Sequence, residues 1–406
     1  MNLLIIPSWY PRPDDKINGC FFQEQAKLVT DCLDVKVLMF RFSRPSIRLL
    51  VKTPLRTGVD WMRYLFQQKS RVRLPNDEVF TDPPLIEYRL GVFGATQRQR
   101  HEKRLQAYLQ ALEELMFTGW KPDLIHAHSV SLGGLVAQRI KEVYGIPYVI
   151  TEHVPFVLCN YPGHLHSDIK NAFKNAKSVL SLGIDTVRQL GFSGIYVETN
   201  LIYNLVDEFV FTKICSSYKA EQTLKLISIG SASHFKDHVT LLRALLVLKH
   251  QGIPFTLTLI GLKAWGDLYN ETLEFIRSND LEHDVSVIDR IDRADVCSYL
   301  ASHHVFLMTS IFETFCVSII EALATGLPVI TTNHGGGSID LITPKTGAVV
   351  PIRNYRAVAD KLIDIYHGNI RFDPQTIRDC VIAVCGRDAF RVRLIGYYEQ
   401  AMAKAS

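Results

Sequence analysis

The sequence predicts an α/β protein built from two doubly wound domains, each a parallel sheet with helices on both faces. Short apolar runs alternate with segments of helical periodicity along most of the chain, which is typical of repeated strand–helix units. The alternation stops over 204–222, a polar segment without clear periodicity, and then begins again. The chain has 406 residues, of which 47% are hydrophobic, so it can bury two cores.

The first series of runs predicts a domain over residues 1–205. Its apolar runs have the length and composition of buried strands in a parallel sheet. We expect strands at 3–7, 35–40, 123–128, 147–151 and 178–181, and helices at 21–30 and 133–144. The strand at 123–128 ends in a polar tip, which predicts functional side chains at the carboxyl edge of this sheet.

The second series predicts a domain over residues 206–406. We expect strands at 224–230, 255–261, 285–288, 305–309 and 328–332, and helices at 239–248, 268–278, 294–301 and 316–324. The last helices, within 355–403, complete this domain, and we expect the final one to pack back on the first domain. Because ligands of doubly wound sheets bind at the carboxyl ends of strands, two facing sheets predict a ligand cleft between the domains.

The charge of the chain is unevenly distributed. The formal net charge is only +4, which does not indicate a nucleic-acid partner. Within 41–73, however, nine basic residues stand against Asp60 alone, so this window carries +8 and the remainder −4. The window belongs to a basic insertion at 41–105 and also contains aromatic residues. It suits an anionic membrane surface, while an anionic glycan, a nucleic acid or an ordinary basic insertion remain alternatives.

Targeting signals and disulfides are not indicated. No run of 18 apolar residues exists, so we expect no transmembrane helix. The apolar start lacks a basic n-region and is ended by Pro7, which argues against a signal peptide. The eight cysteines include no Cys-x-x-Cys pair and are expected to be reduced thiols. We therefore expect a cytoplasmic protein, with peripheral attachment to the inner face of the plasma membrane through 41–73.

The most informative segment is 310–331, in which Glu313 precedes a predicted helix and Glu321 lies eight residues later within it. A helix N-terminus offers free N–H groups and a positive dipole end, which favour phosphate. A carboxylate beside it can accept hydrogen bonds from sugar hydroxyls. Spacing alone leaves open the alternative that Glu313 caps the helix and that Glu321 is a solvated charge.

The wider string at 309–350 resembles the E-x7-E segment of family 4 retaining glycosyltransferases of the bacterial surface-glycan type, which have the GT-B fold. Many positions agree in order, including Gly326 and Pro328 after the second glutamate. Where the family usually has Phe-Gly-Leu, this chain has Phe315, Cys316 and Val317. The implied donor contact is made by backbone N–H groups there, so Cys316 is acceptable if its dihedral angles are ordinary, although its side chain narrows the phosphate site.

The loop at 230–237 resembles a second element of the same family. It follows a predicted strand, and Lys236 matches the lysine that neutralises the leaving diphosphate. Ser231 stands where arginine is usual, so one cation is missing, although the Ser231 hydroxyl can still donate to phosphate. Without the resemblance, Lys236 would be an ordinary surface lysine.

The first domain contributes three further candidates by resemblance. His126 and His128 alternate onto one face of a strand tip, and the resemblance implies that His128 faces the acceptor and the donor sugar while His126 is structural. A metal pair would need further ligands that the sequence does not supply nearby, and two packed core histidines are the other alternative. His153 ends the next strand, and Gly19 opens a helix after a Trp-Tyr-Pro loop. Both are candidate contacts in the cleft.

The resemblance implies transfer of a hexose from a nucleotide-diphosphate-sugar to a hydroxyl, with retained configuration. Arg290 and Ile291 would meet the base, Glu321 the ribose, and Glu313 the sugar. We favour a UDP-sugar over a GDP-sugar, a glycan or polyprenyl-linked acceptor, a role in cell-surface polysaccharide biosynthesis, and no cofactor or metal. A sugar-nucleotide epimerase, a phosphorylase and a non-catalytic nucleotide-sugar-binding protein are the alternatives.

Overall fold

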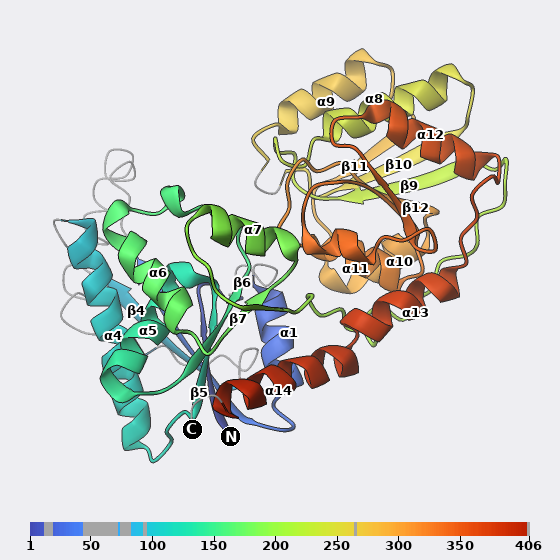
Figure 1. Ribbon diagram of the computed structural model, residues 1–406. Helices are drawn as coiled ribbons and strands as arrows, with labels where there is room; N and C mark the ends of the chain where they lie inside the picture. Colours follow the sequence, from blue (N-terminus) through green and yellow to red (C-terminus); the bar gives the residue numbers. More distant parts are fainter. Residues whose placement is uncertain (12–18, 44–71, 74–82, 92–95, 264–265, 404–406) are drawn as a thin grey trace. The chain divides into compact units, whose positions relative to one another are not determined.

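The computed structural model describes residues 1–11, 19–43, 72–73, 83–91, 96–263 and 266–403. The chain forms two compact units (Figure 1). One comprises Met1–Ser181, Gln189–Asn200 and Leu394–Ser406, and the other comprises Leu182–Arg188 and Leu201–Arg393. The main division therefore falls between Asn200 and Leu201, shortly before the polar segment 204–222. The end of the last helix belongs to the first unit.

The first unit is built on an eight-stranded sheet of order β3-β4-β2-β1-β5-β6-β7-β8. Strand β3 is antiparallel to β4, and the pairs from β4 across to β7 are parallel. The strands are β1 (Asn2–Pro7), β2 (Asp34–Ser43), β3 (Val72–Arg73), β4 (Leu85–Gly91), β5 (Leu124–His128), β6 (Tyr148–Glu152), β7 (Ser178–Ser181) and β8 (Thr199–Leu201).

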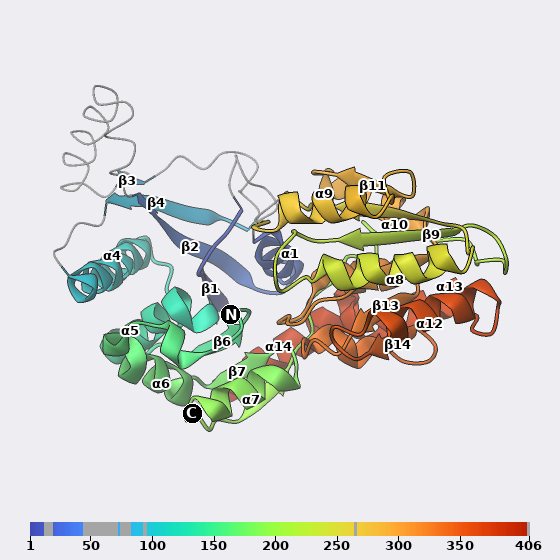
Figure 2. The ribbon, with the colours of Figure 1, turned by 90° about the horizontal axis from the view of Figure 1, so that it is seen from above.

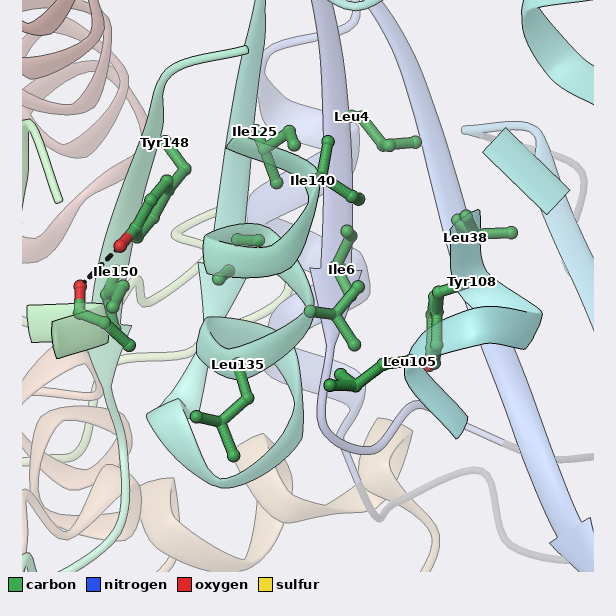
Figure 3. Close-up of a cluster of buried hydrophobic side chains, with 14 of the residues drawn as sticks. Leu4, Ile6, Leu38, Leu105, Tyr108, Ile125, Leu135, Ile140, Tyr148 and Ile150 are labelled. Atoms are coloured by element: carbon green, nitrogen blue, oxygen red, sulfur yellow. Dashed lines mark hydrogen bonds between the residues drawn. The ribbon is translucent and has the colours of Figure 1, made fainter. Parts of the chain in front are cut away.

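Helices cover this sheet, with α4, α5 and α6 on one face and α1 on the other (Figures 1 and 2). Leu4 and Ile6 of β1 pack with side chains of α4 and α5 in a buried cluster (Figure 3). The helices are α1 (Cys20–Leu28), α4 (Gln97–Phe117), α5 (Leu135–Tyr144) and α6 (His166–Asn175), and α7 (Ile184–Phe192) is divided between the units at Gln189. The expected helix at 133–144 is preceded by a π-helical turn, η2 (Ser129–Gly134).

The segment expected to be a basic insertion, 41–105, is partly integral to the sheet. Strand β4 pairs with β2 over Leu85–Gly91, and α4 begins at Gln97. This part of the prediction is wrong, because β4 is a strand of the sheet whose pairing with β2 the sequence does not show. Residues 44–71, which hold most of the +8 window, lie outside the described residues.

The second unit has a six-stranded parallel sheet of order β11-β10-β9-β12-β13-β14. Its strands are β9 (Leu224–Ile229), β10 (Phe255–Ile260), β11 (Val285–Ile288), β12 (Val305–Met308), β13 (Val329–Thr332) and β14 (Gly347–Val350). Its helices are α8 (His238–His250), α9 (Tyr269–Ser278), α10 (Arg293–Ala301), α11 (Val317–Ala324), α12 (Tyr355–Tyr366) and α13 (Pro374–Cys385), and α14 (Arg387–Ala403) begins in this unit and ends in the first. Helices α8, α9 and α12 lie on one face, and α10, α11 and α13 on the other (Figure 1).

The prediction of two doubly wound domains is confirmed. In the second sheet the strand order reverses between β9 and β12, so the chain leaves these neighbours toward opposite faces. A crevice outside the carboxyl ends of two such strands is the usual ligand position in this architecture. The loops after β9 and β12 are the two loops that contain Lys236 and Glu313. Among the described residues, no helix is both long and apolar enough to cross a membrane.

Candidate functional site

The loops after β9 and β12 are joined by hydrogen bonds. The Ile311 N–H donates to the carbonyl of Phe235 at 2.7 Å, and the Thr309 hydroxyl donates to the carbonyl of Asp237 at 2.9 Å. Asp237 also caps α8 by accepting from the Thr240 N–H. These hydrogen bonds hold the backbone on both sides of Lys236. The fold therefore fixes the position from which the Lys236 side chain extends.

Lys236 and Glu313 form an ion pair at this switch point. Lys236 Nζ lies 2.6 Å from Glu313 Oε1, and only 22% and 13% of the two side chains are exposed. The Ser310 hydroxyl donates to the same Oε1 at 2.7 Å. Burial lowers the pKa of Lys236, but the Glu313 carboxylate more than offsets this and the pKa is raised. The ammonium therefore stays charged, with two of its three N–H groups left for other acceptors.

Glycines bring a third segment against Glu313. A Cβ on Gly336 would lie 2.9 Å from Glu313 Cβ, closer than real side chains approach. The Gly337 N–H donates to the Thr314 carbonyl at 3.1 Å, and the Glu313 N–H donates to the His334 carbonyl at 3.3 Å. Glu313 is thus held on its backbone by 334–337 and on its side chain by Lys236. It does not cap α11, whose N-cap residue is Cys316.

Helix α11 begins directly after this pair. The N–H groups of Val317 and Ser318 open the helix and have no carbonyl available within it, which is the arrangement that binds phosphate. Phe315 is buried. Cys316 has φ +72° and ψ +83°, a left-handed conformation that favours glycine. The condition under which Cys316 would be acceptable, ordinary dihedral angles, is therefore not met, and the departure from the family pattern lies at a position where a side chain is strained.

The strain at Cys316 is measurable by comparing two variants that both lack the thiol. We expect Cys316→Gly to be about 1 kcal/mol more stable than Cys316→Ala. A left-handed conformation costs an L-residue about 1–2 kcal/mol, which glycine avoids, but the greater conformational entropy of glycine in the unfolded chain offsets part of this advantage. Denaturant unfolding of both variants measures the difference. At Ser318, inside α11, the matched pair should show alanine more stable than glycine by about 1 kcal/mol. If glycine and alanine ranked in the same order of stability at positions 316 and 318, the result would contradict backbone strain at Cys316.

Glu321 is buried in α11 rather than solvated. It is 6% exposed, and its Oε1 lies 2.8 Å from Arg293 Nη1 at the start of α10. Burial raises the pKa of Glu321, and the Arg293 guanidinium opposes that rise. The sequence reasoning missed Arg293, whose only signal is its place at the first position of a helix after a strand. The ion pair with Arg293 orients the Glu321 carboxylate, which the family resemblance implies to bind the ribose.

The remaining donor-side candidates lie in neighbouring loops of the same unit. Ser231 follows β9 and is half-buried, and its carbonyl accepts from the Ser233 N–H at 2.9 Å. Arg290 and Ile291 lie in the loop after β11, with Arg290 exposed and Ile291 half-buried. The structure brings Lys236, Glu313 and the start of α11 together, whereas Arg290 and Ile291 come from a loop that follows the edge strand.

The histidines of the first unit form a separate buried cluster at the ends of β5 and β6. The His128 Nδ1 lies 3.0 Å from His153 Nε2, and the rings of His126 and His128 are 4.1 Å apart. His126 is bonded on both nitrogens, to the Tyr398 hydroxyl and to the Thr151 hydroxyl, each at 2.7 Å. Burial lowers the pKa of His126 to about 3 and places those of His128 and His153 well below the usual value. All three are neutral near pH 7.

Glu152, which sequence reasoning passed over, anchors this cluster. It is fully buried and accepts from the N–H groups of Val130, His153 and Val154 at 2.9–3.1 Å. Burial raises the pKa of Glu152, and these hydrogen bonds lower it. A buried carboxylate that collects several backbone donors fixes the turn after β5. The only sign of Glu152 in the sequence was its position between Thr151 and His153 at the end of a predicted strand.

Gly19 closes the other side of the cluster. Its φ is +83°, and a Cβ would lie 3.0 Å from Trp9 Cδ1, so only glycine fits without strain. It starts α1, which places Phe22 with its ring 4.5 Å from that of His128 and 4.7 Å from that of His153. The cluster is therefore a packed aromatic and imidazole group. Across the described residues, no three His, Cys, Asp or Glu side chains are grouped so as to hold a metal ion.

Two family models match the chain. The one described as Glycosyl transferases group 1 matches residues 212–376, and the one described as Glycosyltransferase Family 4 matches residues 72–207. The amylovoran biosynthesis glycosyltransferase AmsK of Erwinia amylovora is 28% identical over 36% of this chain and 37% of its own length. A GDP-mannose-dependent alpha-mannosyltransferase of Mycobacterium tuberculosis is 38% identical over 24% of this chain and 26% of its own. The matched region spans about a third of these relatives or less.

Solved structures show the same fold at low identity. The sucrose-phosphate synthase of Thermosynechococcus elongatus superposes with a TM-score of 0.71 at 16% identity and covers 100% of both chains. The Anabaena protein HepE in complex with UDP-glucose superposes with a TM-score of 0.67 at 15% identity, over 98% of this chain and 99% of that one. These matches extend across both units.

Proposed function

The chain belongs to the family 4 glycosyltransferases and has their GT-B fold, and on that premise we propose that it transfers a hexose from a nucleotide-diphosphate-sugar to a hydroxyl with retained configuration. The observation that carries the proposal is the Lys236–Glu313 pair beside the N-terminus of α11. A charged ammonium and free helix N–H groups stabilise a diphosphate as charge develops on it, and an adjacent carboxylate accepts from sugar hydroxyls.

The donor is a UDP-sugar in this proposal. The HepE complex holds UDP-glucose in the same fold, which supports it, and the mannosyltransferase that depends on GDP-mannose makes a GDP-sugar the alternative. Glu321, directed by Arg293, meets the ribose, and Ser231 donates to phosphate in place of a cation. Arg290 and Ile291 meet the base, and the N–H groups that follow Phe315 meet the diphosphate.

The transfer step in this proposal follows a front-face mechanism. The glycosidic bond to the leaving phosphate breaks, the acceptor oxygen bonds to the anomeric carbon on the same face, and the acceptor proton passes to the leaving phosphate oxygen. Lys236 stabilises that phosphate, and Glu313 orients the sugar through its hydroxyls. Glu313, paired with Lys236, acts as a positioning group in the proposed mechanism, and no carboxylate of this site acts as a covalent nucleophile. No metal ion is required.

The first unit supplies the acceptor contacts. His128 and His153, packed against Phe22, meet the acceptor and the donor sugar, and Gly19 allows the loop before α1 to approach closely. The relative named for amylovoran biosynthesis supports a role in polysaccharide biosynthesis. In this proposal the polysaccharide is a cell-surface one, and the acceptor is a glycan or is polyprenyl-linked. The 41–73 window holds the enzyme peripherally at the anionic inner face of the plasma membrane.

A thermal-shift screen against UDP, GDP, ADP and their sugars tests the donor. Stabilisation grows with the logarithm of ligand concentration over Kd, so one nucleotide should raise the Tm well above the others at equal concentration. NMR of the product with a hydroxyl acceptor then reports the anomeric configuration, in buffer with and without EDTA. We expect UDP to stand out, retention, and unchanged activity in EDTA. An inverted product, or nucleotide-sugar consumed without any glycoside formed, contradicts the proposal.

A further inference from the structure

A cavity of about 290 Å³ lies at the amino ends of β12 and β13, away from the Lys236–Glu313 pair. Its lining includes His304 and Pro328, each directly before one of these strands. Lys236 and Glu313 follow the carboxyl ends of β9 and β12. Because the strands are parallel, the cavity and the donor site lie at opposite edges of one sheet, and a ligand in one leaves the other open.

Two chain segments make the walls of the cavity, and both are fixed. The segment 215–220 is anchored by the Cys215 N–H on the Thr325 carbonyl at 2.8 Å, and by the Glu221 N–H on the Tyr366 carbonyl at 2.9 Å. The turn after α12 is the second segment of the lining and meets the first, since Gly368 has φ +74° and a Cβ there would lie 3.1 Å from Ala220 Cβ. Backbone hydrogen bonds therefore fix the segments that form the cavity.

The charged groups that line the cavity are cationic. Lys219 and Arg371 belong to the lining, and no Asp or Glu does. Arg371 donates through Nε to the Gly368 carbonyl at 3.3 Å, and its Nη groups have no partner among the residues described. Asp373, which follows the turn in sequence, is engaged by α13, where it accepts from the Thr376 N–H at 2.8 Å and the Thr376 hydroxyl at 2.6 Å. Lys219 and Arg371, both exposed, therefore have no counterion within the lining.

Apart from the hydroxyls of Ser216 and Ser217, the rest of the lining is apolar or aromatic. The Tyr218 and His304 rings pack 5.0 Å apart, and Ile365 and Phe372 also belong to the lining. Burial is the main cause of a lowered pKa at His304 and raises that of the Cys215 thiol to about 11, so both are neutral near pH 7. A volume at the low end of ligand pockets, with ring faces and a cationic rim, suits one ring carrying one anionic group.

We propose that this cavity is a second ligand site that binds a small phosphomonoester with a single-ring body, such as a sugar phosphate or an aryl phosphate. Arg371 and Lys219 take the phosphate, whose near-dianionic charge and three terminal oxygens match two cations and the hydroxyls of Ser216 and Ser217. The ring lies against Tyr218 and Phe372.

Calorimetric titration of the full chain with phenyl phosphate tests the site. We expect binding that Arg371→Gln weakens by roughly tenfold or more, since a charge-assisted hydrogen bond of about 1.5–3 kcal/mol is lost. Arg356→Gln, an exposed arginine on α12, is the matched control and should leave Kd within about twofold. Phenol, which has the ring without the anion, should bind far more weakly than phenyl phosphate.

Two further variants separate this site from the donor site. Lys236→Gln should leave phenyl phosphate binding unchanged, whereas Ala220→Leu, which fills the cavity from the wall of 215–220, should abolish it with the Tm retained. Binding that is lost in Lys236→Gln and kept in Arg371→Gln would assign the anion to the donor site and overturn the proposal. Absence of any saturable phenyl phosphate binding to the wild-type chain overturns it as well.

Discussion

Replacing Lys236 with alanine is expected to lower kcat/KM for sugar transfer by about a hundred- to a thousandfold. Lys236 is the charged group at the carboxyl end of β9, and removing one preorganised donor to developing negative charge costs about 3–4 kcal/mol of transition-state stabilisation. The change also leaves Glu313 without its partner at 2.6 Å. The rate of glycoside formation from the nucleotide-sugar measures the loss of kcat/KM. The affinity for the free nucleotide measures how much of that loss is weaker ground-state binding.

Two companion variants interpret that result. Glu313→Ala removes the other member of the pair and should be comparably inactive, while Lys345→Ala, an exposed lysine of the same unit, should keep wild-type activity. The Tm of each variant shows whether the protein remains folded. Transfer near the wild-type rate in both Lys236→Ala and Glu313→Ala would exclude the pair from catalysis.

A steep loss of stability between pH 6.5 and 4 is the second large expected effect. Burial lowers the pKa of His238 and of His334 to about 4, and that of His126 to about 3. Each is neutral in the folded protein as pH falls through 6.5, while the unfolded chain takes up the proton. The unfolded state then binds more protons, so the free energy of unfolding decreases as pH falls, by up to about 3 kcal/mol for His238 alone.

Denaturant unfolding at a series of pH values between 7.5 and 4 measures this loss. His238→Gln should flatten the dependence by the contribution of one proton, because the variant has no imidazole to charge in the unfolded chain. His234→Gln, which changes an exposed histidine four residues earlier, is the matched control and should follow the wild type. A free energy of unfolding that stays constant from pH 6.5 to 4.5 would contradict the neutral burial of these side chains.

Several strands could not be predicted from the sequence. Strand β4 was included in the insertion 41–105, which was assigned from the nine basic residues of 41–73, although residues 74–91 themselves hold four acids and one base. Its partner β2 lies over 40 residues earlier, and the pairing supplies the hydrogen bonds that make it a strand. Strand β14 was missed because Gly347 opens it, and glycine weakens a strand pattern.

The candidate site was predicted residue by residue but not as an arrangement. Lys236 and Glu313 each matched a family element, yet they are 77 residues apart, and no spacing rule predicts their direct contact. Arg293 and Glu152 had no motif of their own. Each acts through a buried partner, Glu321 in one case and the backbone after β5 in the other, and such partners are fixed only by folding.

The sequence by itself determined two doubly wound domains and the family, because strand–helix periodicity and short motifs are local properties of the chain. Tertiary structure alone decided that Lys236 pairs with Glu313, that Glu321 is buried against Arg293, and that Cys316 has a positive φ. The physical reason is that charge pairing, burial and backbone strain depend on which segments the sheet order brings together. Adjacency of β9 and β12, strands about 80 residues apart, is what turns two motifs into one site.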